Sequence, residues 1–146
     1  MSEKAWSEWS SDDERKREIL GEPRVIAVVG MSPNRDRPSN YVALYLKEHG
    51  HTIIPVHPAA SEVEGLKAYP DLRSIPKAMR VELVNLFVAP ERTLPVVEQA
   101  AEIGAKTVWF QPGAEHPPAV ERALVLGLEV FSGVCIKAEH GRLIGA

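Results

Sequence analysis

Two arginines and two serines share one short loop, and their types and spacing suit the binding of phosphate. Arg35, Arg37, Ser32 and Ser39 lie between an apolar run and an amphipathic segment, in a loop that begins at Gly30. A guanidinium group holds phosphate through two parallel hydrogen bonds, and the free amides and dipole of a helix start favour the same anion. Gly30 allows the backbone to approach a ligand closely. The loop therefore predicts a phosphate site; the alternative is a solvated loop whose arginines pair with a neighbouring aspartate or with nothing.

Three further turns follow apolar runs later in the chain. His57 is placed to stack on a purine or bond a ribose, although a partly exposed histidine at a strand end is an equal alternative. Val88 and Pro90 form an apolar wall that suits an adenine or an aliphatic arm, or they simply pack strand on helix. The candidate ligand residues at these turns are His57 and Pro58; Phe87, Val88, Ala89 and Pro90; and Gln111, Pro112 and Gly113.

The other residues with reactive side chains do not form a catalytic or metal-binding pattern. None of the five histidines stands at a recognised metal spacing, and His49 and His51, on either side of a helix-ending glycine, are expected to be solvated. Cys135 is expected to be a buried small hydrophobe, with a nucleophile assisted by His140 as the alternative. No acid directly follows the second apolar run, where a nicotinamide-binding protein carries one for the ribose. We therefore predict no catalytic residue and no metal site.

Alternating apolar runs and amphipathic segments must position these residues. Continuous apolar stretches predict buried parallel strands, and Pro55 inside the second stretch predicts a strand end or an edge position. Proline at the start and glycine after the end predict the helix bounds. The expected strands are 25–29, 52–56, 82–88, 107–110 and 129–131, and the expected helices are 38–48, 91–103 and 117–126. The alternation predicts an α/β fold: a Rossmann-like, doubly wound parallel sheet of about five strands in three α/β/α layers, with ligands at the carboxyl ends of the strands.

Composition and charge narrow the class of protein. The 146 residues are 45% hydrophobic and 25% charged, as in an ordinary soluble single domain. The net charge of −3 argues against a nucleic-acid partner. The single cysteine excludes an internal disulfide framework, and no apolar run is long enough to predict a membrane span. The N-terminus does not resemble a secretory signal, so we expect a cytoplasmic protein. We interpret residues 1–22 as a helical arm that packs on the domain through Trp6, Trp9 and Leu20; the alternative is a frayed arm. Residues 23–146 are interpreted as the ligand-binding domain.

The strand-end segments, taken together and in order, are similar to those of a known family. They are AVVGMSPNRDRPS, IIPVHP with the downstream AYPDLRSIP, LFVAPE, AKTVWFQPGA and CIKAEH, within residues 23–143. These segments resemble the small stand-alone CoA-binding domain proteins, which are relatives of the N-terminal domain of the succinyl-CoA synthetase α subunit. The resemblance implies the Rossmann-like CoA-binding fold, in agreement with the prediction made from the residues.

The resemblance also implies roles for residues of the first loop. Gly30, Met31 and Ser32 match the part of the family's loop where backbone and hydroxyl groups meet the CoA phosphates. Arg35 and Arg37 fall in the same loop as possible phosphate partners. The loop lacks the additional glycines of the synthetase, which leaves open a different position for the pyrophosphate.

The later strand ends complete the implied site. His57 and Pro58 match an element near the adenosine end, Phe87 to Pro90 match a turn that packs against the cofactor, and Gln111, Pro112 and Gly113 match the strand end nearer the pantetheine arm. The implied function is the binding of coenzyme A or a short acyl-CoA without catalysis. An NAD(P)-dependent oxidoreductase and an acyl-CoA-processing enzyme that uses Cys135 are the alternatives. Self-association or a protein partner is left open.

Overall fold

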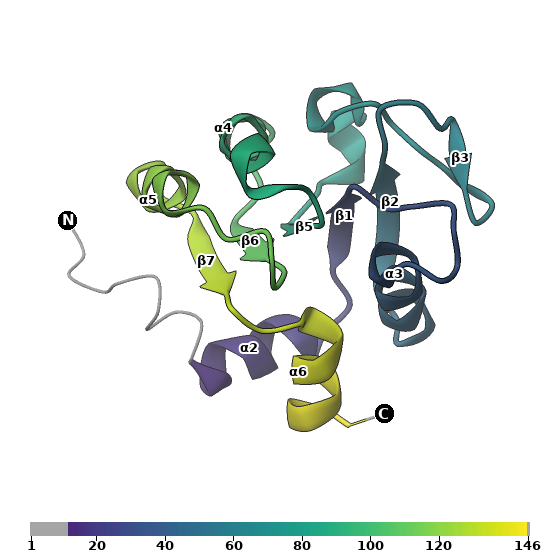
Figure 1. Cartoon of the computed structure of the whole chain (residues 1–146). Coiled ribbons are helices and arrows are strands. Elements are labelled where there is room, and N and C mark those ends of the chain that lie inside the picture. The colour runs from purple at the N-terminus through teal and green to yellow at the C-terminus, as the bar shows by residue number, and fades with distance from the viewer. Residues whose placement is uncertain (1–11, 146) are drawn as a thin grey trace.

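A parallel sheet of five strands forms the centre of the molecule. The computed structural model describes residues 12–145, and its sheet has the strand order β2-β1-β5-β6-β7 (Figure 1). Each strand is one of the predicted apolar runs, and Pro55 lies in the edge strand, as expected. The strands are β1 (Val25–Val29), β2 (Thr52–Val56), β5 (Leu83–Leu86), β6 (Thr107–Phe110) and β7 (Glu129–Ser132).

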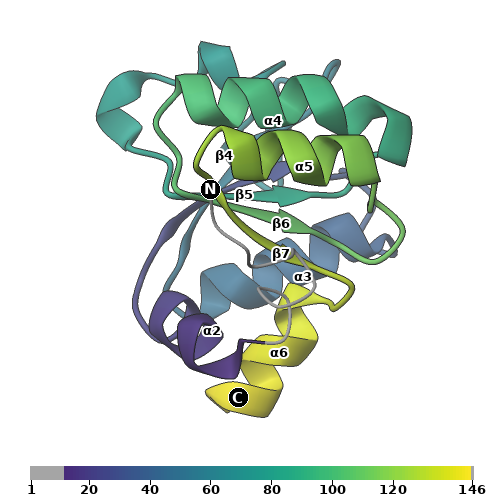
Figure 2. The ribbon, with the colours of Figure 1, turned by 90° about the vertical axis from the view of Figure 1, so that its left-hand side faces the viewer.

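Helices cover both faces of this sheet, so the predicted three layers are confirmed. Figure 2 shows α4 (Thr93–Glu102) and α5 (Pro117–Val125) on one face, and α2 (Asp13–Leu20), α3 (Pro38–Glu48) and α6 (Ile136–Leu143) on the other. Because side chains alternate along a strand, each face has its own apolar core, and the two cores are separate clusters. No helix among residues 12–145 is long and apolar enough to cross a membrane.

The connection between β2 and β5 is the longest in the fold. It contains a two-stranded hairpin, β3 (Glu62–Val63) with β4 (Leu66–Lys67), which the sequence analysis did not predict. Short 3-10 turns follow it at η1 (Leu72–Ser74) and η2 (Lys77–Met79), and a third, η3 (Pro90–Arg92), precedes α4. The third strand is therefore shorter than predicted, and the helix after it begins at Thr93, because the chain turns through η3 first.

The strand order reverses direction at one place in the sheet. From β1 the chain moves outward to β2 and then returns past β1 to β5. In open parallel sheets, the loops that leave two adjacent strands at such a reversal diverge, and ligands bind in the gap at the carboxyl ends. Here the reversal lies between β1 and β5, which pair directly.

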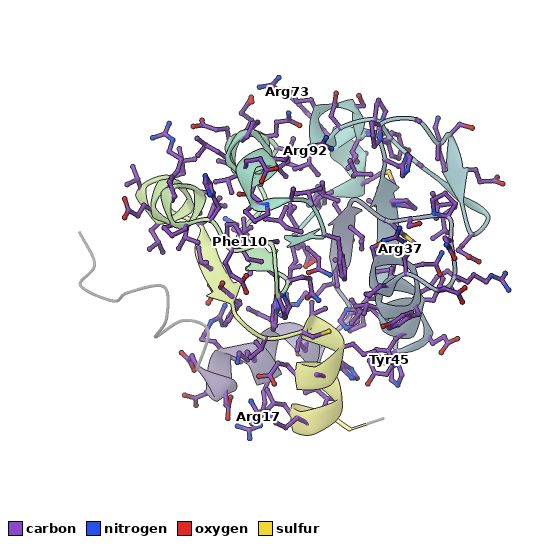
Figure 3. The ribbon with its side chains drawn as sticks, viewed as in Figure 1. Arg17, Arg37, Tyr45, Arg73, Arg92 and Phe110 are labelled. Atoms are coloured by element: carbon purple, nitrogen blue, oxygen red, sulfur yellow. The ribbon has the colours of Figure 1, made fainter. Side chains whose placement is uncertain are left out.

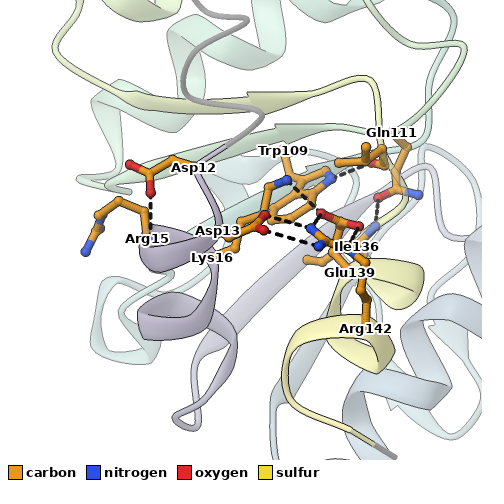
Figure 4. A network of polar contacts seen from close by, with 10 residues as sticks. Asp12, Asp13, Arg15, Lys16, Trp109, Gln111, Ile136, Glu139 and Arg142 are labelled. Atoms are coloured by element: carbon orange, nitrogen blue, oxygen red, sulfur yellow. Dashed lines mark hydrogen bonds and ion pairs between the residues drawn. The ribbon is translucent and has the colours of Figure 1, made fainter.

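A buried ion pair fastens the N-terminal helix to the C-terminal one. Lys16 Nζ lies 2.7 Å from Glu139 Oε1, and both side chains are almost fully buried (Figure 4). Arg142 binds the same carboxylate and also Asp13. Leu20 is buried, as predicted, whereas Trp6 and Trp9 lie outside the described residues. Helix α6 itself was not predicted, since its short sequence follows directly after a glycine-containing turn.

Three histidines and a tyrosine gather where α3 and α6 meet. The His140 Nδ1 atom lies 2.8 Å from the Tyr45 hydroxyl, and the His140 ring centroid is 4.9 Å from that of His49. His51 is only 4% exposed, and its Nδ1 accepts a hydrogen bond from the Arg24 amide. The prediction that His49 and His51 are solvated is wrong for His51, which is buried, whereas His49 is half-buried against Tyr45 and His140.

We expect the stability of the fold to decrease as the pH falls from about 7.5 to 5.5. Burial lowers the pKa of His51 and of His140, and neighbouring histidines add to this effect in both. In the unfolded chain both rings take up protons near the ordinary value of 6.5, so the unfolded state binds more protons than the folded one below that pH. Urea unfolding at several pH values measures the trend. The double variant His51→Gln/His140→Gln should flatten it, and a wild-type slope in that variant would contradict the assignment.

Candidate functional site

A pocket of about 380 Å³ opens at the carboxyl ends of β5 and β6. Helices α3 and α6 both begin at its rim, so it lies on the α3 and α6 face of the sheet, beside the reversal between β1 and β5. The lining residues are Arg37, Pro38, Ser39, Phe87, Gln111, Pro112 and Cys135. Of these, Arg37, Ser39, Phe87, Gln111 and Pro112 were predicted ligand residues, and Cys135 was the alternative nucleophile. The structure thus brings together residues from three separate predicted turns.

The remaining predicted residues lie outside the pocket lining. They are Gly30, Met31, Ser32 and Arg35 in the first loop, His57 and Pro58 after β2, Val88, Ala89 and Pro90 after β5, and Gly113 after β6. The Met31 side chain is fully buried in the core, so only its backbone is placed to face a ligand. Each of these residues still follows a parallel strand and lies at the carboxyl edge of the sheet.

The turn after β1 is possible only for glycine. Gly30 has a φ of +89°, a conformation that L residues rarely adopt. A Cβ atom at this position would stand 2.3 Å from the backbone oxygen of Phe87, at the end of β5. The Phe87 amide in turn donates to the carbonyl of Val29. The first loop and the end of β5 are therefore in direct contact across the reversal of the sheet.

Serine side chains hold the first loop in shape. The Ser39 Oγ accepts from the Ser32 amide at 3.0 Å, and the Ser32 Oγ accepts from the Asn34 amide at 3.0 Å. Both hydroxyls were predicted to meet a ligand; each keeps its own proton, so it can still donate to one. Within residues 12–145, the amides of Met31 and Ser39 have no acceptor, and Ser39 lies in the first turn of α3. These donors are the groups a phosphate would meet.

The two arginines of the loop differ in their surroundings. Arg37 is the N-cap residue of α3, is exposed, lines the pocket and has no ion-pair partner among residues 12–145 (Figure 3). Arg35 instead donates from Nε and Nη2 to the two carboxylate oxygens of Glu64, each at 3.1 Å. The alternative of an arginine paired with a carboxylate is thus observed for Arg35, although the partner comes from the β3–β4 hairpin.

Gln111 joins the strand end to the start of α6. Its side chain is nearly fully buried; Oε1 accepts from the Ile136 amide at 3.0 Å, and Nε2 donates to the Cys135 sulfur at 3.3 Å (Figure 4). Cys135 is half-buried in the pocket wall and is not the fully buried hydrophobe that was expected. His140 is bonded to Tyr45 away from this wall, so the structure does not pair it with Cys135.

The histidine after β2 has a fixed orientation. The Nδ1 atom of His57 accepts from the amides of Ala59 and Ala60, at 3.0 and 2.9 Å. An Nδ1 that accepts two hydrogen bonds leaves the ring proton on Nε2. The half-buried ring therefore presents a donor at the strand end, in the position where the sequence predicted a contact with a ribose or purine.

The apolar side of the pocket differs from the predicted wall. Val88 and Pro90 were expected to form it, yet Phe87 lines the pocket together with Pro38 and Pro112. Side chains alternate along the strand, so Phe87 packs with the α3 and α6 core and Val88 with the opposite core.

No group of three potential metal ligands occurs in the part of the chain that the structure describes.

We expect Gly30→Ala to destabilise the protein by at least about 2 kcal/mol, since it combines a left-handed conformation with a backbone collision. Gly127→Ala is the matched control, because Gly127 has a similar φ of +85° and a Cβ atom added there would have nothing within 4 Å. The control should cost only the conformational part, about 1 kcal/mol. Urea unfolding of both variants measures the difference, and equal losses would mean that the Phe87 contact is not a constraint.

Comparison with known proteins shows the family of the chain. Residues 24–141 match the family described as CoA binding domain. The uncharacterised protein YneT of Bacillus subtilis (strain 168) is 35% identical over 124 residues, covering 85% of this chain and 90% of that protein. A hypothetical protein from Pyrococcus horikoshii OT3 has a solved structure that is 42% identical, with a TM-score of 0.90 over 99% of this chain and 100% of its own.

A larger enzyme contains a similar segment. The ADP-forming acetate–CoA ligase I of Archaeoglobus fulgidus is 30% identical over 91 residues, which is 62% of this chain but 13% of the ligase. The expected kinship with succinyl-CoA synthetase stays a prediction, whereas the fold and the wider family are confirmed. With its sheet order, its pocket at the strand ends and a family match over most of its length, the chain belongs to the CoA binding domain family.

Proposed function

We propose that this protein binds coenzyme A or a short acyl-CoA across the carboxyl ends of β1, β5 and β6. The observation that carries the proposal is the pocket itself, which joins the guanidinium group of Arg37 to the apolar side chains of Phe87 and Pro112. CoA has the same two characters, because a charged phosphate end is linked to a long, largely uncharged arm. Such a site needs cations and amides at one end and an apolar wall at the other.

The arrangement suggests how the parts of the ligand lie. The phosphates face Arg37 and the amides of Met31 and Ser39, where the start of α3 also favours an anion. The pantetheine arm enters the pocket, whose volume of about 380 Å³ suits part of the ligand rather than all of it. The adenosine then extends along the surface toward the Nε2 donor of His57.

The chemistry of the pocket wall favours binding over catalysis. As described over residues 12–145, the lining contains no histidine and no carboxylate to act as a general acid or base. The strand end that would hold a nicotinamide ribose through an acid carries His57 instead. We therefore expect titration with CoA to give heat of binding and titration with NAD⁺ to give none.

We expect Arg37→Ala to weaken CoA binding by about tenfold or more, since a charge-assisted hydrogen bond to phosphate is worth roughly 1.5–3 kcal/mol. Arg35→Ala should cost less, because Arg35 is already engaged by Glu64. Arg17→Ala is the control; Arg17 projects from α2, far from Arg37 in Figure 3. Isothermal titration calorimetry gives the three affinities. Absence of any heat with the wild-type protein at millimolar CoA would refute the proposed function.

A second candidate function rests on the Cys135 thiol in the pocket wall. An acyl-CoA held there would allow the sulfur to attack the thioester carbonyl, so that the bond from this carbon to the CoA sulfur breaks. The thiol proton passes to the departing CoA, which leaves acyl-Cys135 and free CoA without any oxidant. Gln111 holds the sulfur in place through its hydrogen bond.

Intact-mass measurement after incubation with acetyl-CoA tests this second candidate. If the reaction occurs, the wild-type protein gains one acetyl group that hydroxylamine removes, while Cys135→Ala gains none. The Cys135→Ala variant should still bind CoA with near wild-type affinity, because the thiol makes no contact with the phosphate end. Equal acetylation of wild type and Cys135→Ala, or none of either, would leave binding as the function of the pocket.

A further inference from the structure

The tip of the β3–β4 hairpin reaches the first loop through one carboxylate. Glu64 accepts two hydrogen bonds from Arg35, each at 3.1 Å, and a third from Asn40 Nδ2 at 2.9 Å. Arg35 comes from the loop after β1 and Asn40 from the first turn of α3. Figure 1 shows the hairpin beside this loop, although the two are separate in the sequence. Two donors of the predicted phosphate loop and one of the adjoining helix therefore converge on an anion that the protein itself supplies.

The carboxylate is held more firmly than an ordinary surface acid. The Glu64 side chain is only 11% exposed, whereas that of Arg35 is 81% exposed. The hydrogen bonds from Arg35 and then Asn40 lower the pKa of Glu64, so it is ionised at neutral pH. Its backbone has a φ of +54°, which is unfavourable for a residue with a Cβ. The turn thus places a charged group against the loop in spite of local strain.

Asn40 makes the contact part of the loop architecture. Its side chain is fully buried, and Nδ2 donates both to Glu64 and to the carbonyl of Ser32. Its Oδ1 atom is buried and has no donor among residues 12–145. A buried acceptor without a donor is unfavourable, so the arrangement with Glu64 in place does not satisfy every group of the loop.

We propose that Glu64 is an internal competitor for the ligand's phosphate: its carboxylate occupies the Arg35 and Asn40 donors, and a phosphate group of CoA displaces it on binding. The proposal rests on the proposed function. A phosphate offers more negative charge and more acceptor oxygens than a carboxylate, so it forms the stronger bonds with the same guanidinium and amide. Glu64 then lowers the affinity below what the loop alone provides and links ligand binding to the position of the hairpin.

The substitution Glu64→Gln tests this role. Glutamine keeps the size of the side chain and an oxygen that accepts from Asn40, so the hairpin keeps its contact while the competing charge is lost. Calorimetry with CoA should show affinity about three- to tenfold tighter than wild type. The gain should be smaller when Arg35→Ala is also present, because the released guanidinium is then missing.

Glu62→Gln is the matched control. Glu62 lies in the same hairpin, is exposed and has no ion pair within the described part of the chain, so its loss changes the net charge equally without freeing Arg35. Unchanged or weaker CoA binding by Glu64→Gln, or an equal gain in Glu62→Gln, would overturn the competitor role while wild-type binding still upheld the proposed function. If neither the wild-type protein nor any variant binds CoA, the proposed function is refuted, and the competitor role, which rests on it, is refuted as well.

Repeating the titrations with dephospho-CoA identifies the phosphate that displaces the carboxylate. If Glu64→Gln also binds dephospho-CoA more tightly than the wild-type protein does, the pyrophosphate displaces the carboxylate. If the variant binds only CoA more tightly, the 3′-phosphate displaces it. Either result supports displacement by a phosphate group. A similar gain with pantetheine, which carries no phosphate, would contradict it.

Discussion

The site depends on the close approach of two backbone segments at the reversal of the sheet. The Gly30 Cα packs against the carbonyl of Phe87 so tightly that no side chain fits between them, and the positive φ of Gly30 turns the chain away from β1 at that point. This contact joins the first loop to the end of β5, and both segments contribute residues to the pocket lining. It directs the first loop toward the start of α3 and places the end of β5 beside it. The pocket then forms between this pair of segments, the end of β6 and the start of α6.

Much of the fold is predictable because its signals are local. Apolar runs such as Val25–Val29 are typical of buried strands, and proline and glycine mark where helices begin and end. Parallel strands bring their carboxyl ends to one edge of the sheet. For this reason Arg37, Ser39, Phe87 and Gln111 could be predicted to lie near one another before their contacts in the pocket lining were known. The prediction for Val88 failed because the face on which a side chain lies depends on where β5 ends, which the sequence did not indicate.

The unpredicted features depend on contacts between segments distant in the sequence. Lys16 meets Glu139, Arg35 meets Glu64, and Gln111 meets Ile136, and none of these pairs has a local sequence signal. Each requires that the hairpin or α6 already be in place. Helix α6 is short and was itself not predicted, so the burial of His51 and the exposure of the Cys135 thiol to the pocket were unpredictable for the same reason. Long-range pairing, rather than composition, sets the chemistry of this site.

The proposed function requires a protein of net negative charge to hold a phosphate group. The net charge is −3, so the overall field repels phosphate, and attraction must come from groups at short range. Backbone amides of the first loop and the exposed guanidinium of Arg37 provide it without a broad basic surface. Arg35 of the same loop is already paired with Glu64, so in the proposed site one carboxylate sets how much of this guanidinium a ligand meets. If the proposed competition occurs, ligand affinity is set by the release of a cation already present in the loop, which a uniformly basic surface has no means to do.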